Sequence, residues 1–464
     1  MKYISTRNTN LNLGFCDVVL AGLPEDGGLY MPKQYPHFSE TELRKLRGLS
    51  YEEIALFVMR PFIDTEIESS KLEEIVKKAY CNFRHAAVTP LIQLDNSNFL
   101  LELFHGPTLS FKDIAMQLLA ELIDHILEER DQYITIVGAT SGDTGAAAIK
   151  AFSGRKRVNI CILFPKDRIS SVQQKQMTTS KASNSSVIAI EGSFDDCQKL
   201  IKDLFSDTHF RNEMNLSGIN SINWARIMAQ MVYYFVSSIA LGIPDRKISF
   251  SVPTGNFGDI FAGYSAKIMG LPVEKFIIAT NDNDILVRMF NTGRYEPETV
   301  KITTSPAMDI QISSNFERLL FEISDRDSAV VRESMSSLEK NQYFQIAPEH
   351  LHKIRRIFCA KKASQRDVDD IIYSVLKKSH CLVDPHTAVG IYASRECRHS
   401  AIPIVTLATA HPSKFPEAVK NAVGEAPDFP MFLENSWEGD ENLEVMDKEI
   451  EKIKEFIKNK KYGD

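Results

Sequence analysis

The chain has 464 residues, of which 44% are hydrophobic and 25% charged, and its formal net charge is −7. Single hydrophobic cores stop growing at about 250–300 residues, so we expect two or three packed units. Acidic and basic residues are interspersed, which argues against a nucleic-acid-binding face. No run of about 18 apolar residues could cross a membrane, and the N-terminus lacks the apolar stretch of a signal peptide. We therefore expect a cytoplasmic protein.

Seven cysteines are spread from Cys16 to Cys397, and no two of them form a C-x-x-C pair. An odd and scattered set predicts buried free thiols in a reducing compartment, not a disulfide scaffold or a zinc site. The spacing of His380 and His386 fits no standard metal site. We expect these histidines to pack in the core or a loop, and we predict no bound metal.

The predicted elements change in character along the chain. Residues 1–85 mix short elements with a turn-rich segment, GLPEDGGLYMP, and helical patterns over 51–63 and 71–80. Beyond them, short apolar runs bounded by turn residues predict strands at 134–137, 158–164, 187–190, 248–252, 276–279 and 402–408. Helical patterns separate most of these strands, which predicts an α/β fold with parallel sheets covered on both faces.

This pattern divides the chain into an N-terminal domain over 1–85 and two α/β domains over 86–245 and 246–464. A more polar, mostly helical lobe is inserted in the last domain at about 297–379. Near the C-terminus, apolar residues at helical spacing predict an amphipathic helix: Leu443, Met446, Ile450, Ile453 and Ile457. Ligands of parallel sheets bind beyond the carboxyl ends of the strands, so chemistry is expected in the strand-to-helix turns.

The segment PTGNFGD, residues 253–259, follows a predicted strand and opens a helical pattern. Gly255 and Gly258 let backbone amides approach a ligand, and the helix N-terminus supplies free N–H groups and the positive end of its dipole. The segment is neither a Walker loop nor a G-x-G-x-x-G motif. It predicts a phosphate-binding turn, although a tight turn without a ligand fits the same residues.

A second glycine-rich turn, GATSGDTGAA, spans residues 138–147. Thr140, Ser141 and Thr144 add hydroxyl groups that suit a small anion such as a carboxylate. The charge of Asp143 would repel an anion, so we expect its side chain to accept a hydrogen bond from a ligand hydroxyl. N-capping of the following helix by Asp143 or Thr144 is the structural alternative.

The third segment, HGPTLSFKDIAMQ, spans residues 105–117 and places Lys112 at the start of a mainly apolar helical pattern. Most lysines are solvated surface groups, but apolar surroundings lower the pKa of a lysine and make a Schiff base with a carbonyl feasible. A carbonyl-capturing lysine, a phosphate turn and a carboxylate turn are the parts that pyridoxal phosphate needs to act on an amino acid.

The wording and order of these segments resemble the threonine synthase family of the bacterial and fungal type. These are fold type II, tryptophan-synthase-β-like enzymes that depend on pyridoxal phosphate. The resemblance covers nearly the whole chain. It is carried by STR with GLPEDGGLYMP, LELFHGPTLSFKD, ATSGDTG, EGSFDDCQ, NSINWARIMAQ, PTGNFGD, SPAMDIQISSNFERLLF, DPHTAVG and TLATAHPSKFPEA. It implies a lyase that converts O-phospho-L-homoserine and water to L-threonine and phosphate, the last step of threonine biosynthesis.

The resemblance also implies roles for residues at the cofactor. Lys112 matches the lysine that binds pyridoxal phosphate and later moves protons, and Phe111 should stack on or shield the ring. The residues that match the loop around the cofactor phosphate are Gly255, Asn256, Phe257 and Gly258.

Two further residues are assigned to the cofactor ring. Asp143 occupies a place where more distant relatives carry an asparagine facing the phenolic oxygen, so it should share a proton with that oxygen or a neighbour. Thr409 matches a hydroxyl residue beside the pyridine nitrogen. A neutral hydroxyl there favours an unprotonated ring, which suits elimination better than transamination.

The substrate residues follow from the same resemblance. Arg226, in NSINWAR, matches the arginine expected to meet the phosphate of O-phospho-L-homoserine, because guanidinium offers a bidentate fork. Asn223 is expected to assist. An exposed arginine on the helix surface is the alternative, but its neighbours in the sequence are mostly apolar. The residues that match the grip on the substrate carboxylate are Thr140, Ser141, Gly142 and Thr144.

Two competing interpretations have weaker support. Another fold type II activity, such as threonine dehydratase or a β-replacing synthase, would not need the long N-terminal domain or the SPAMDIQISSNFERLLF lobe. A catalytically weak binding module would not need Lys112 and a complete phosphate turn. We expect a small-molecule substrate, neither nucleic acid nor membrane as a partner, and a monomer or homodimer.

Overall fold

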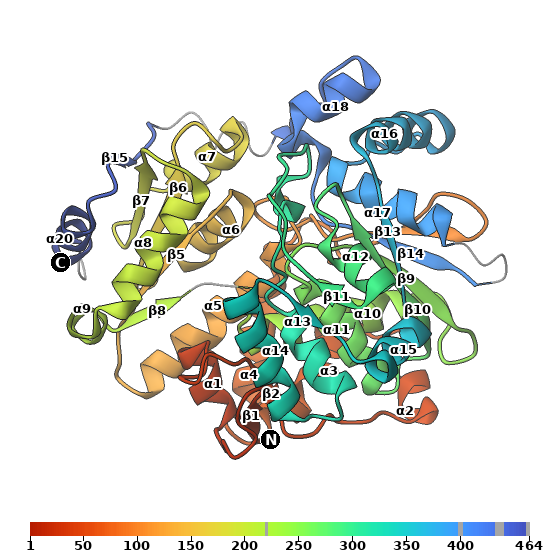
Figure 1. Cartoon of the computed structure of the whole chain (residues 1–464), viewed down its shortest axis with the longest axis horizontal. Coiled ribbons are helices and arrows are strands. Elements are labelled where there is room, and N and C mark those ends of the chain that lie inside the picture. The colour runs from red at the N-terminus through yellow and green to blue at the C-terminus, as the bar shows by residue number, and fades with distance from the viewer. Residues whose placement is uncertain (219–220, 398–401, 432–439, 461–464) are drawn as a thin grey trace.

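The computed structural model describes residues 1–218, 221–397, 402–431 and 440–460, and it arranges them around two parallel sheets (Figure 1). One sheet has five strands in the order β15-β7-β6-β5-β8, and the other has six in the order β13-β10-β9-β14-β4-β3. Two small antiparallel pairs, β1 with β2 and β11 with β12, complete the strands of the described residues.

All neighbours in the five-stranded sheet are parallel. Its strands are β5 (Ile134–Ala139), β6 (Val158–Pro165), β7 (Ser185–Ile190), β8 (Leu216–Gly218) and β15 (Glu444–Met446). Successive side chains of a strand point to opposite faces. In β6, Ile160 and Ile162 join the main core with α6 (Asp143–Phe152), whereas Cys161 and Leu163 pack under α8 (Phe194–Ser206) and α20 (Ile450–Asn459). Both faces are therefore buried, as expected of a parallel sheet.

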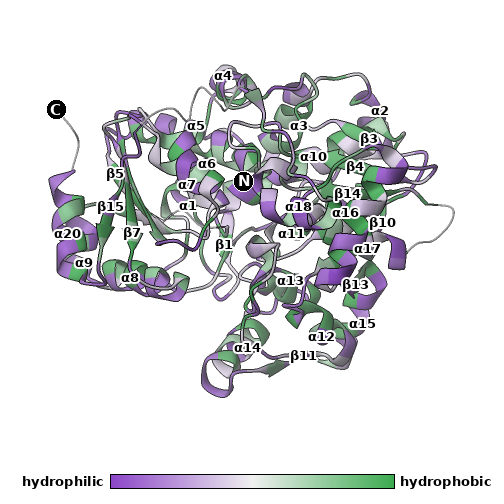
Figure 2. Cartoon of the chain, turned by 90° about the horizontal axis from the view of Figure 1, so that it is seen from above, coloured by the Kyte–Doolittle hydropathy of each residue, from purple (hydrophilic) through white to green (hydrophobic). Residues whose placement is uncertain are grey.

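The six-stranded sheet is parallel except at its β3 edge. Its strands are β3 (Leu91–Gln93), β4 (Asn98–Glu102), β9 (Ile248–Pro253), β10 (Val273–Thr280), β13 (Phe358–Lys362) and β14 (Ile404–Ala408). One face packs under α16 (Gln365–Ser379) and α17 (Pro385–Glu396), and the other faces the core that contains α10 (Trp224–Ala240) and α11 (Gly258–Ile268). Figure 2 shows the hydrophobic strands enclosed by helices whose outer surfaces are hydrophilic.

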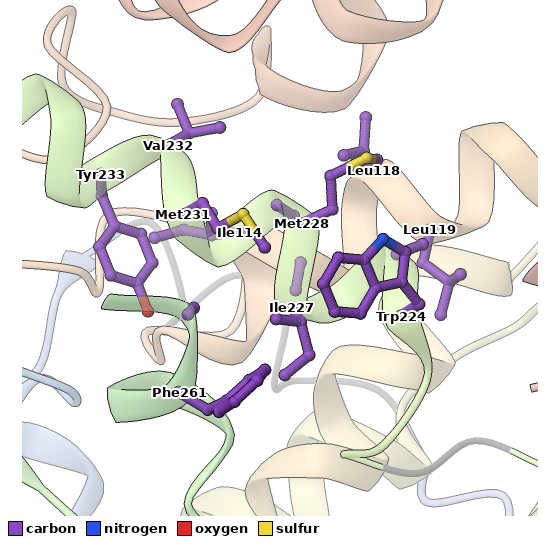
Figure 3. Close-up of a cluster of buried hydrophobic side chains, with 14 of the residues drawn as sticks. Ile114, Leu118, Leu119, Trp224, Ile227, Met228, Met231, Val232, Tyr233 and Phe261 are labelled. Atoms are coloured by element: carbon purple, nitrogen blue, oxygen red, sulfur yellow. The ribbon is translucent and has the colours of Figure 1, made fainter. Parts of the chain in front are cut away.

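α10 runs through the centre of the molecule and is buried almost throughout its length. Its apolar side chains contact α5 (Lys112–Glu129) and α11, as shown for Leu118, Met228 and Phe261 in Figure 3. The N-terminal elements pack on the same central layer, with α3 (Tyr51–Ile63) against α10 and α4 (Ser69–Tyr80) against α5. Remaining N-terminal elements are β1 (Tyr3–Ser5), α1 (Phe15–Ala21), β2 (Tyr30–Pro32) and α2 (Glu40–Lys45).

Several helices begin at capping boxes, in which a serine and the third helical residue bond each other's backbone N–H. Ser170 and Gln173 start α7 (Ser171–Thr178) this way, and Ser364 with Asp367 starts α16. The other helices are α9 (Thr208–Glu213), α12 (Ile285–Thr292), α13 (Phe316–Ile323), α14 (Ser328–Asn341), α15 (Pro348–Ile357) and α18 (Pro416–Val423). Short 3₁₀ turns are η1 (Pro306–Met308) and η2 (Pro412–Lys414), and the last short pair is β11 (Arg294–Tyr295) with β12 (Phe344–Gln345).

The two sheets do not follow the division of the chain at residues 85/86 and 245/246. β3 and β4 lie within 86–245 yet join the six-stranded sheet, while β15 comes from the C-terminal part and joins the five-stranded sheet. The segment 297–379 is mostly helical but also supplies β13, the edge strand of the six-stranded sheet. Sheet membership depends on long-range pairing, which local patterns do not encode.

Two local expectations need correction. Leu443 and Met446 do not continue the terminal helix, because β15 pairs there with β7 and the helix α20 begins only at Ile450; Ile453 and Ile457 are its buried residues. Cys359 and Cys397 are not free thiols but form a disulfide. The pair is 38 residues apart in the sequence, and it is brought together because α17 packs against β13.

The other cysteines are free in the structure, and three of them, Cys16, Cys161 and Cys197, are buried. No described helix combines the length and the apolar character needed to span a bilayer.

Candidate active site

A cavity lies between the two sheets, where the carboxyl ends of their central strands approach each other. The turn after β5 contributes to one wall, the turns after β9 and β14 to another, and the start of α5 and of α10 close it. The sequence-predicted residues that line it are Phe111, Lys112, Asp143, Thr144, Arg226, Gly255, Asn256, Phe257, Gly258 and Thr409. Parallel sheets place ligands at this position because their strand-to-helix turns gather there.

Lys112 is the first residue of α5, and its side chain is only 12% exposed. Its Nζ lies 4.7 Å from the centroid of the Phe111 ring and 3.3 Å from Asp143 Oδ2. The backbone N–H of Phe111 donates to the carbonyl of Thr409 at 2.9 Å, which ties the lysine segment to the end of β14. Burial lowers the pKa of Lys112, and the charges of Lys414 and Arg226 lower it further against the opposing effect of Asp143. The amine is thereby favoured in its nucleophilic form.

Asp143 is buried at the first turn of α6, and cations surround its carboxylate. Lys414 Nζ lies 2.9 Å from Oδ1, and the Gln173 amide donates to the same oxygen at 2.9 Å. Burial alone would raise the pKa of Asp143, but Lys414 and Lys112 outweigh it and hold that pKa well below its usual range. Asp143 is therefore held beside two lysines, and its sharing of a proton with the phenolic oxygen of the cofactor stays a prediction.

The turn after β9 has the features of a phosphate cradle. No described residue accepts a hydrogen bond from the backbone N–H groups of residues 255–260. The turn is held in place from outside, because Ser313 Oγ donates to the Gly255 carbonyl at 2.6 Å and Asn315 Nδ2 donates to the Asn256 carbonyl at 3.0 Å. Unpaired N–H groups at the start of α11 are the arrangement that binds an anion.

Phe257 has a left-handed backbone, with φ of 63°, which turns its N–H toward the start of α11. Its ring is buried and packs against the rings of Phe316 and Phe358, at centroid distances of 5.5 Å and 6.1 Å. The backbone of Phe257 thus serves the turn while its side chain fixes the turn to the core.

Arg226 is only 3% exposed, yet its Nε and Nη1 have no hydrogen-bond partner among the described residues. Burial lowers the pKa of Arg226 to about 10, which leaves it charged at neutral pH. A buried, unpaired cation costs stability unless a ligand anion completes it. The exposed-helix alternative for this arginine is excluded, because the side chain lines the cavity.

Some predicted site residues do not line the cavity. Asn223 caps α10 by accepting from the Ala225 N–H at 3.0 Å and donates to the Val19 carbonyl at 2.9 Å, so its amide supports the fold. Thr140 Oγ1 accepts from the N–H groups of Gly142 and Gly145 at 3.0 and 2.9 Å and shapes the turn. Ser141 is exposed and Gly142 is buried beside the cavity.

Four polar residues at the site had not been singled out for it from the sequence. Gln230 lines the cavity one helical turn beyond Arg226, and its Oε1 has no partner among the described residues. Asp259 also lines it, and Lys414 is fully buried behind Asp143. The Gln173 amide donates a hydrogen bond to the Asp143 carboxylate. Only the i, i+4 spacing of Arg226 and Gln230 in a buried helix offered a local signal.

Asp259 follows Gly258 at the start of α11. Its Oδ1 accepts from the hydroxyl groups of Tyr233 and Tyr234, whereas Oδ2 has no partner among the described residues. Burial raises its pKa to about 6 despite these donors.

His386 lines the cavity as well, with its Nδ1 2.6 Å from Asp384 Oδ2 and its Nε2 accepting from the Ala307 N–H at 3.3 Å. Within the described residues no group of histidine, cysteine and acidic side chains could hold a metal. In the structure this histidine packs against the Phe415 ring and makes these hydrogen bonds.

These residues fit pyridoxal phosphate. The N–H groups of residues 255–260, which have no described acceptor, suit its phosphate, and the buried amine of Lys112 suits its carbonyl carbon. Gly255 leaves room at the turn, since a Cβ there would lie 2.6 Å from the Ala307 carbonyl oxygen. Thr409 and Phe111 border the space between these two ends.

Comparisons with known proteins give the same picture. Residues 2–80 match the family model "Threonine synthase N terminus", 83–338 match "Pyridoxal-phosphate dependent enzyme" and 387–457 match "Threonine synthase, C-terminal". The chain is 48% identical to threonine synthase of Pseudomonas aeruginosa, with 98% of each chain covered.

Solved structures are equally similar. Threonine synthase from Brucella melitensis with bound pyridoxal phosphate has a TM-score of 0.98 at 53% identity, over 100% of both chains. The yeast threonine synthase structure has a TM-score of 0.94 at 38% identity, over 99% of this chain and 98% of the other. The chain therefore belongs to the threonine synthase family of pyridoxal-phosphate-dependent enzymes.

Proposed function

We propose that this chain converts O-phospho-L-homoserine and water to L-threonine and phosphate. One observation carries the proposal: a single cavity is lined by a buried lysine, by backbone N–H groups with no acceptor among the described residues, and by a buried guanidinium whose Nε and Nη1 have no described partner. The lysine and the N–H groups account for pyridoxal phosphate. The additional cation is what a substrate with its own phosphate requires.

In this proposal Lys112 binds the cofactor covalently, and the N–H groups of residues 255–260 hold the cofactor phosphate. When bound, pyridoxal phosphate supplies an electron sink for the bonds at the substrate α carbon. Thr409, which lines the cavity at the end of β14, would be the hydroxyl residue beside the ring nitrogen and, as a neutral group, would leave that nitrogen unprotonated. Phe111 shields one face of the ring, consistent with its contact with the Lys112 amine.

The substrate is oriented by its two anionic ends. Arg226 receives the substrate phosphate through Nε and Nη1, which have no described protein partner. The carboxylate binds at the turn 140–144, where no described residue accepts from the N–H groups of Ser141, Asp143 and Thr144. These two anion sites hold the reacting carbons near Lys112 in the same cavity, which supplies catalysis by orientation.

Lys112 is placed to move the protons. Once released by the substrate amine, its Nζ takes the proton from the α carbon and then one from the β carbon. Its lowered pKa suits this task, because an amine that is largely protonated cannot act as a base. Phosphate leaves from the γ carbon with the C–O bond electrons, and the γ carbon gains a proton. Water adds its hydroxyl to the β carbon and gives its remaining proton to the released phosphate, and the α carbon regains a proton from Lys112 Nζ.

The direct test is an assay of the purified, cofactor-loaded protein with O-phospho-L-homoserine, and with L-threonine and L-serine in parallel. We expect equimolar threonine and inorganic phosphate from the first substrate and little ketoacid from the other two. Ketoacid formation from threonine or serine without phosphate release from O-phospho-L-homoserine would assign a dehydratase instead. Bound cofactor without turnover of any of the three would assign a binding module.

We further propose that the protein acts as a monomer or homodimer in the cytoplasm. The cavity is lined by described residues of one chain, so one copy suffices to form it. Sedimentation of the loaded protein measures the assembly, and a larger species would contradict this part of the proposal.

A further inference from the structure

Lys414 is a buried ion-pairing residue behind the cavity. Its side chain is 0% exposed, and it comes from η2, in the connection between β14 and α18. Its Nζ lies 2.9 Å from Asp143 Oδ1, donates to the Thr108 carbonyl at 2.7 Å and donates to Gln176 Oε1 at 2.8 Å. An ammonium group has three protons, and these three acceptors use all of them.

The three acceptors come from different parts of the molecule. Asp143 starts α6, Gln176 lies on α7, and Thr108 lies in the segment before α5. Lys414 therefore connects a turn of the six-stranded sheet to two helices beside the five-stranded sheet. Gln173, also on α7, donates to the same Asp143 oxygen at 2.9 Å.

The two oxygens of Asp143 serve different lysines. Oδ1 receives Lys414 and Gln173, which leaves Oδ2 directed at Lys112 Nζ at 3.3 Å. A buried carboxylate needs a permanent cation, because an unpaired buried charge is strongly destabilising. Lys112 cannot supply one throughout turnover, since its nitrogen is the group proposed to bond covalently to the cofactor. Lys414 has no such duty and does not line the cavity.

We propose that Lys414 is a positioning residue of the reaction, which holds the ionised Asp143 carboxylate in the orientation that places the Lys112 amine. This inference rests on the proposed role of Lys112. It has a second consequence, because the positive charge of Lys414 disfavours protonation of the nearby Lys112 amine. Lys414 thus both positions the Lys112 amine and favours its unprotonated form.

Other charged or titratable groups face this arrangement and are kept constant in the test. Arg226 on α10, Asp259 on α11 and His386 on α17 line the same cavity as Lys112. Asp113 on α5 is buried against Thr108, and the charge of Lys414 acts on its carboxyl group.

The test compares Lys414→Met, Lys414→Arg, Asp143→Asn and the double variant Asp143→Asn/Lys414→Met. Exposed Lys420 on α18 provides the matched control Lys420→Met. For each variant, the rate at which cofactor-free protein captures pyridoxal phosphate is measured against pH, because only the unprotonated Lys112 amine reacts. Turnover of the loaded protein gives kcat and KM separately, and thermal unfolding reports on the fold.

We expect Lys414→Met to raise the pH midpoint of capture by about one unit, since one nearby cation is lost. Its kcat should fall roughly 10- to 100-fold with KM changed much less, because the lysine is misplaced and the substrate anion sites are intact. Lys414→Arg should restore the midpoint, and Lys420→Met should match the parent. The double variant removes both charges of the Lys414–Asp143 pair. Because Lys414 is proposed to act through the Asp143 carboxylate, the kcat of the double variant should equal that of Asp143→Asn alone.

An unchanged capture midpoint in Lys414→Met would overturn the inference, as would a double variant whose loss in kcat is the product of the two single losses. If Lys414→Met does not fold, the double variant still decides the question. Borohydride reduction and peptide mapping of the parent come first. A label outside Lys112 would refute the proposed cofactor lysine, whereas an unmoved midpoint with Lys112 labelled would refute the role of Lys414 alone.

Discussion

Two turns of this protein contain the same Gly-Asp pair at the start of a helix, and their aspartates are in opposite electrostatic situations. Gly142 and Asp143 open α6 after β5, and Gly258 and Asp259 open α11 after β9. Asp143 is paired with Lys414 and Lys112, and its pKa lies well below the usual range. Asp259 is held by two tyrosine hydroxyls and has a pKa raised to about 6.

The backbones of the two turns differ in parallel with their aspartates. In the first turn, Thr140 Oγ1 accepts the N–H groups of Gly142 and Gly145, so part of the anion-binding capacity is used internally. In the second, the N–H groups of residues 255–260 meet no described acceptor. The same short motif thus starts a helix in both turns, while partners elsewhere in the sequence decide the state of its carboxylate and which N–H groups have an acceptor among the described residues.

Lys112 forms an ion pair with the aspartate of the first turn and, within the described residues, none with that of the second. Because it is also the proposed cofactor lysine, its removal has the largest expected effect. Lys112→Ala should lower kcat by roughly 10³-fold or more, because covalent binding and proton transfer are both lost. Borohydride reduction followed by peptide mapping should label Lys112 in the parent. Lys150→Ala, an exposed position on the same turn's helix α6, is the control and should behave as the parent. Labelling of Lys150 or Lys267 would contradict the assignment.

The second largest effect is expected for Arg226, whose Nε and Nη1 have no partner among the described residues of either turn. Arg226→Ala should lower kcat/KM for O-phospho-L-homoserine by about 2–4 kcal/mol, or roughly 30- to 1000-fold, as a charge-assisted bidentate contact is lost. The absorbance of the bound cofactor should persist. Arg226→Lys should restore activity only in part, because a point charge does not reproduce the guanidinium fork. Unchanged efficiency would place the phosphate elsewhere, and a colourless protein would assign Arg226 to the cofactor.

Arg318 provides a matched control for Arg226, because it is also fully buried but has protein partners. It donates to the carbonyls of Tyr30 and Ile222. Arg318→Met should unfold at a clearly lower temperature than the parent, whereas Arg226→Met should not, since its Nε and Nη1 satisfy no described protein group. Equal destabilisation by both variants would mean that Arg226 serves the fold.

The sequence predicted those parts of the fold that local patterns encode. Apolar runs located β5, β6, β7, β9, β10 and β14, and the fold type II class is confirmed. Local patterns did not show that β4 and β13 complete the six-stranded sheet or that β15 pairs with β7. These are pairings between distant segments, and short edge strands carry little periodicity of their own.

The site shows the same limit. Glycines, a lysine after an aromatic residue and an arginine among apolar residues were recognisable because each acts through its local neighbours. Lys414 was not recognisable, because its role depends on contacts with distant residues such as Gln176, which is 238 positions away in the sequence. The pairing of Asp143 with Lys414 was missed for the same reason. The capping role of Asn223 was not foreseen, because an N-cap and a ligand contact use the same side-chain chemistry.

A smaller effect separates the two glycines of the second turn. A Cβ on Gly255 would lie 2.6 Å from the backbone oxygen of Ala307, whereas a Cβ on Gly258 would lie 3.3 Å from the side-chain amide of Asn315. Gly255→Ala should therefore weaken cofactor binding by about 1–3 kcal/mol, or roughly 5- to 150-fold in Kd, because backbone must move. Gly258→Ala should change Kd much less. Equal retention of cofactor by both variants after dialysis would show that the turn does not hold the phosphate.

The smallest expected effect is on stability, and it tests the contrast between the aspartates directly. Burial raises the pKa of Asp259 to about 6, above its unfolded value, so the native state holds the proton more tightly between about pH 4 and 6. Stability contributed by Asp259 is therefore lost as pH rises through this window and stays lost above it.

Asp259→Asn cannot ionise, so its stability relative to the parent should rise by about 2 kcal/mol between pH 4.5 and pH 7.5, following the shift of roughly two units. Denaturant unfolding of the cofactor-free proteins at the two pH values measures this difference. Asp143→Asn should not show the same rise, because the parent carboxylate already has a depressed pKa and remains ionised in the folded protein at both pH values. The same pH response in both variants would remove the distinction between the two Gly-Asp turns, and its absence in Asp259→Asn would mean that burial does not hold a proton on Asp259.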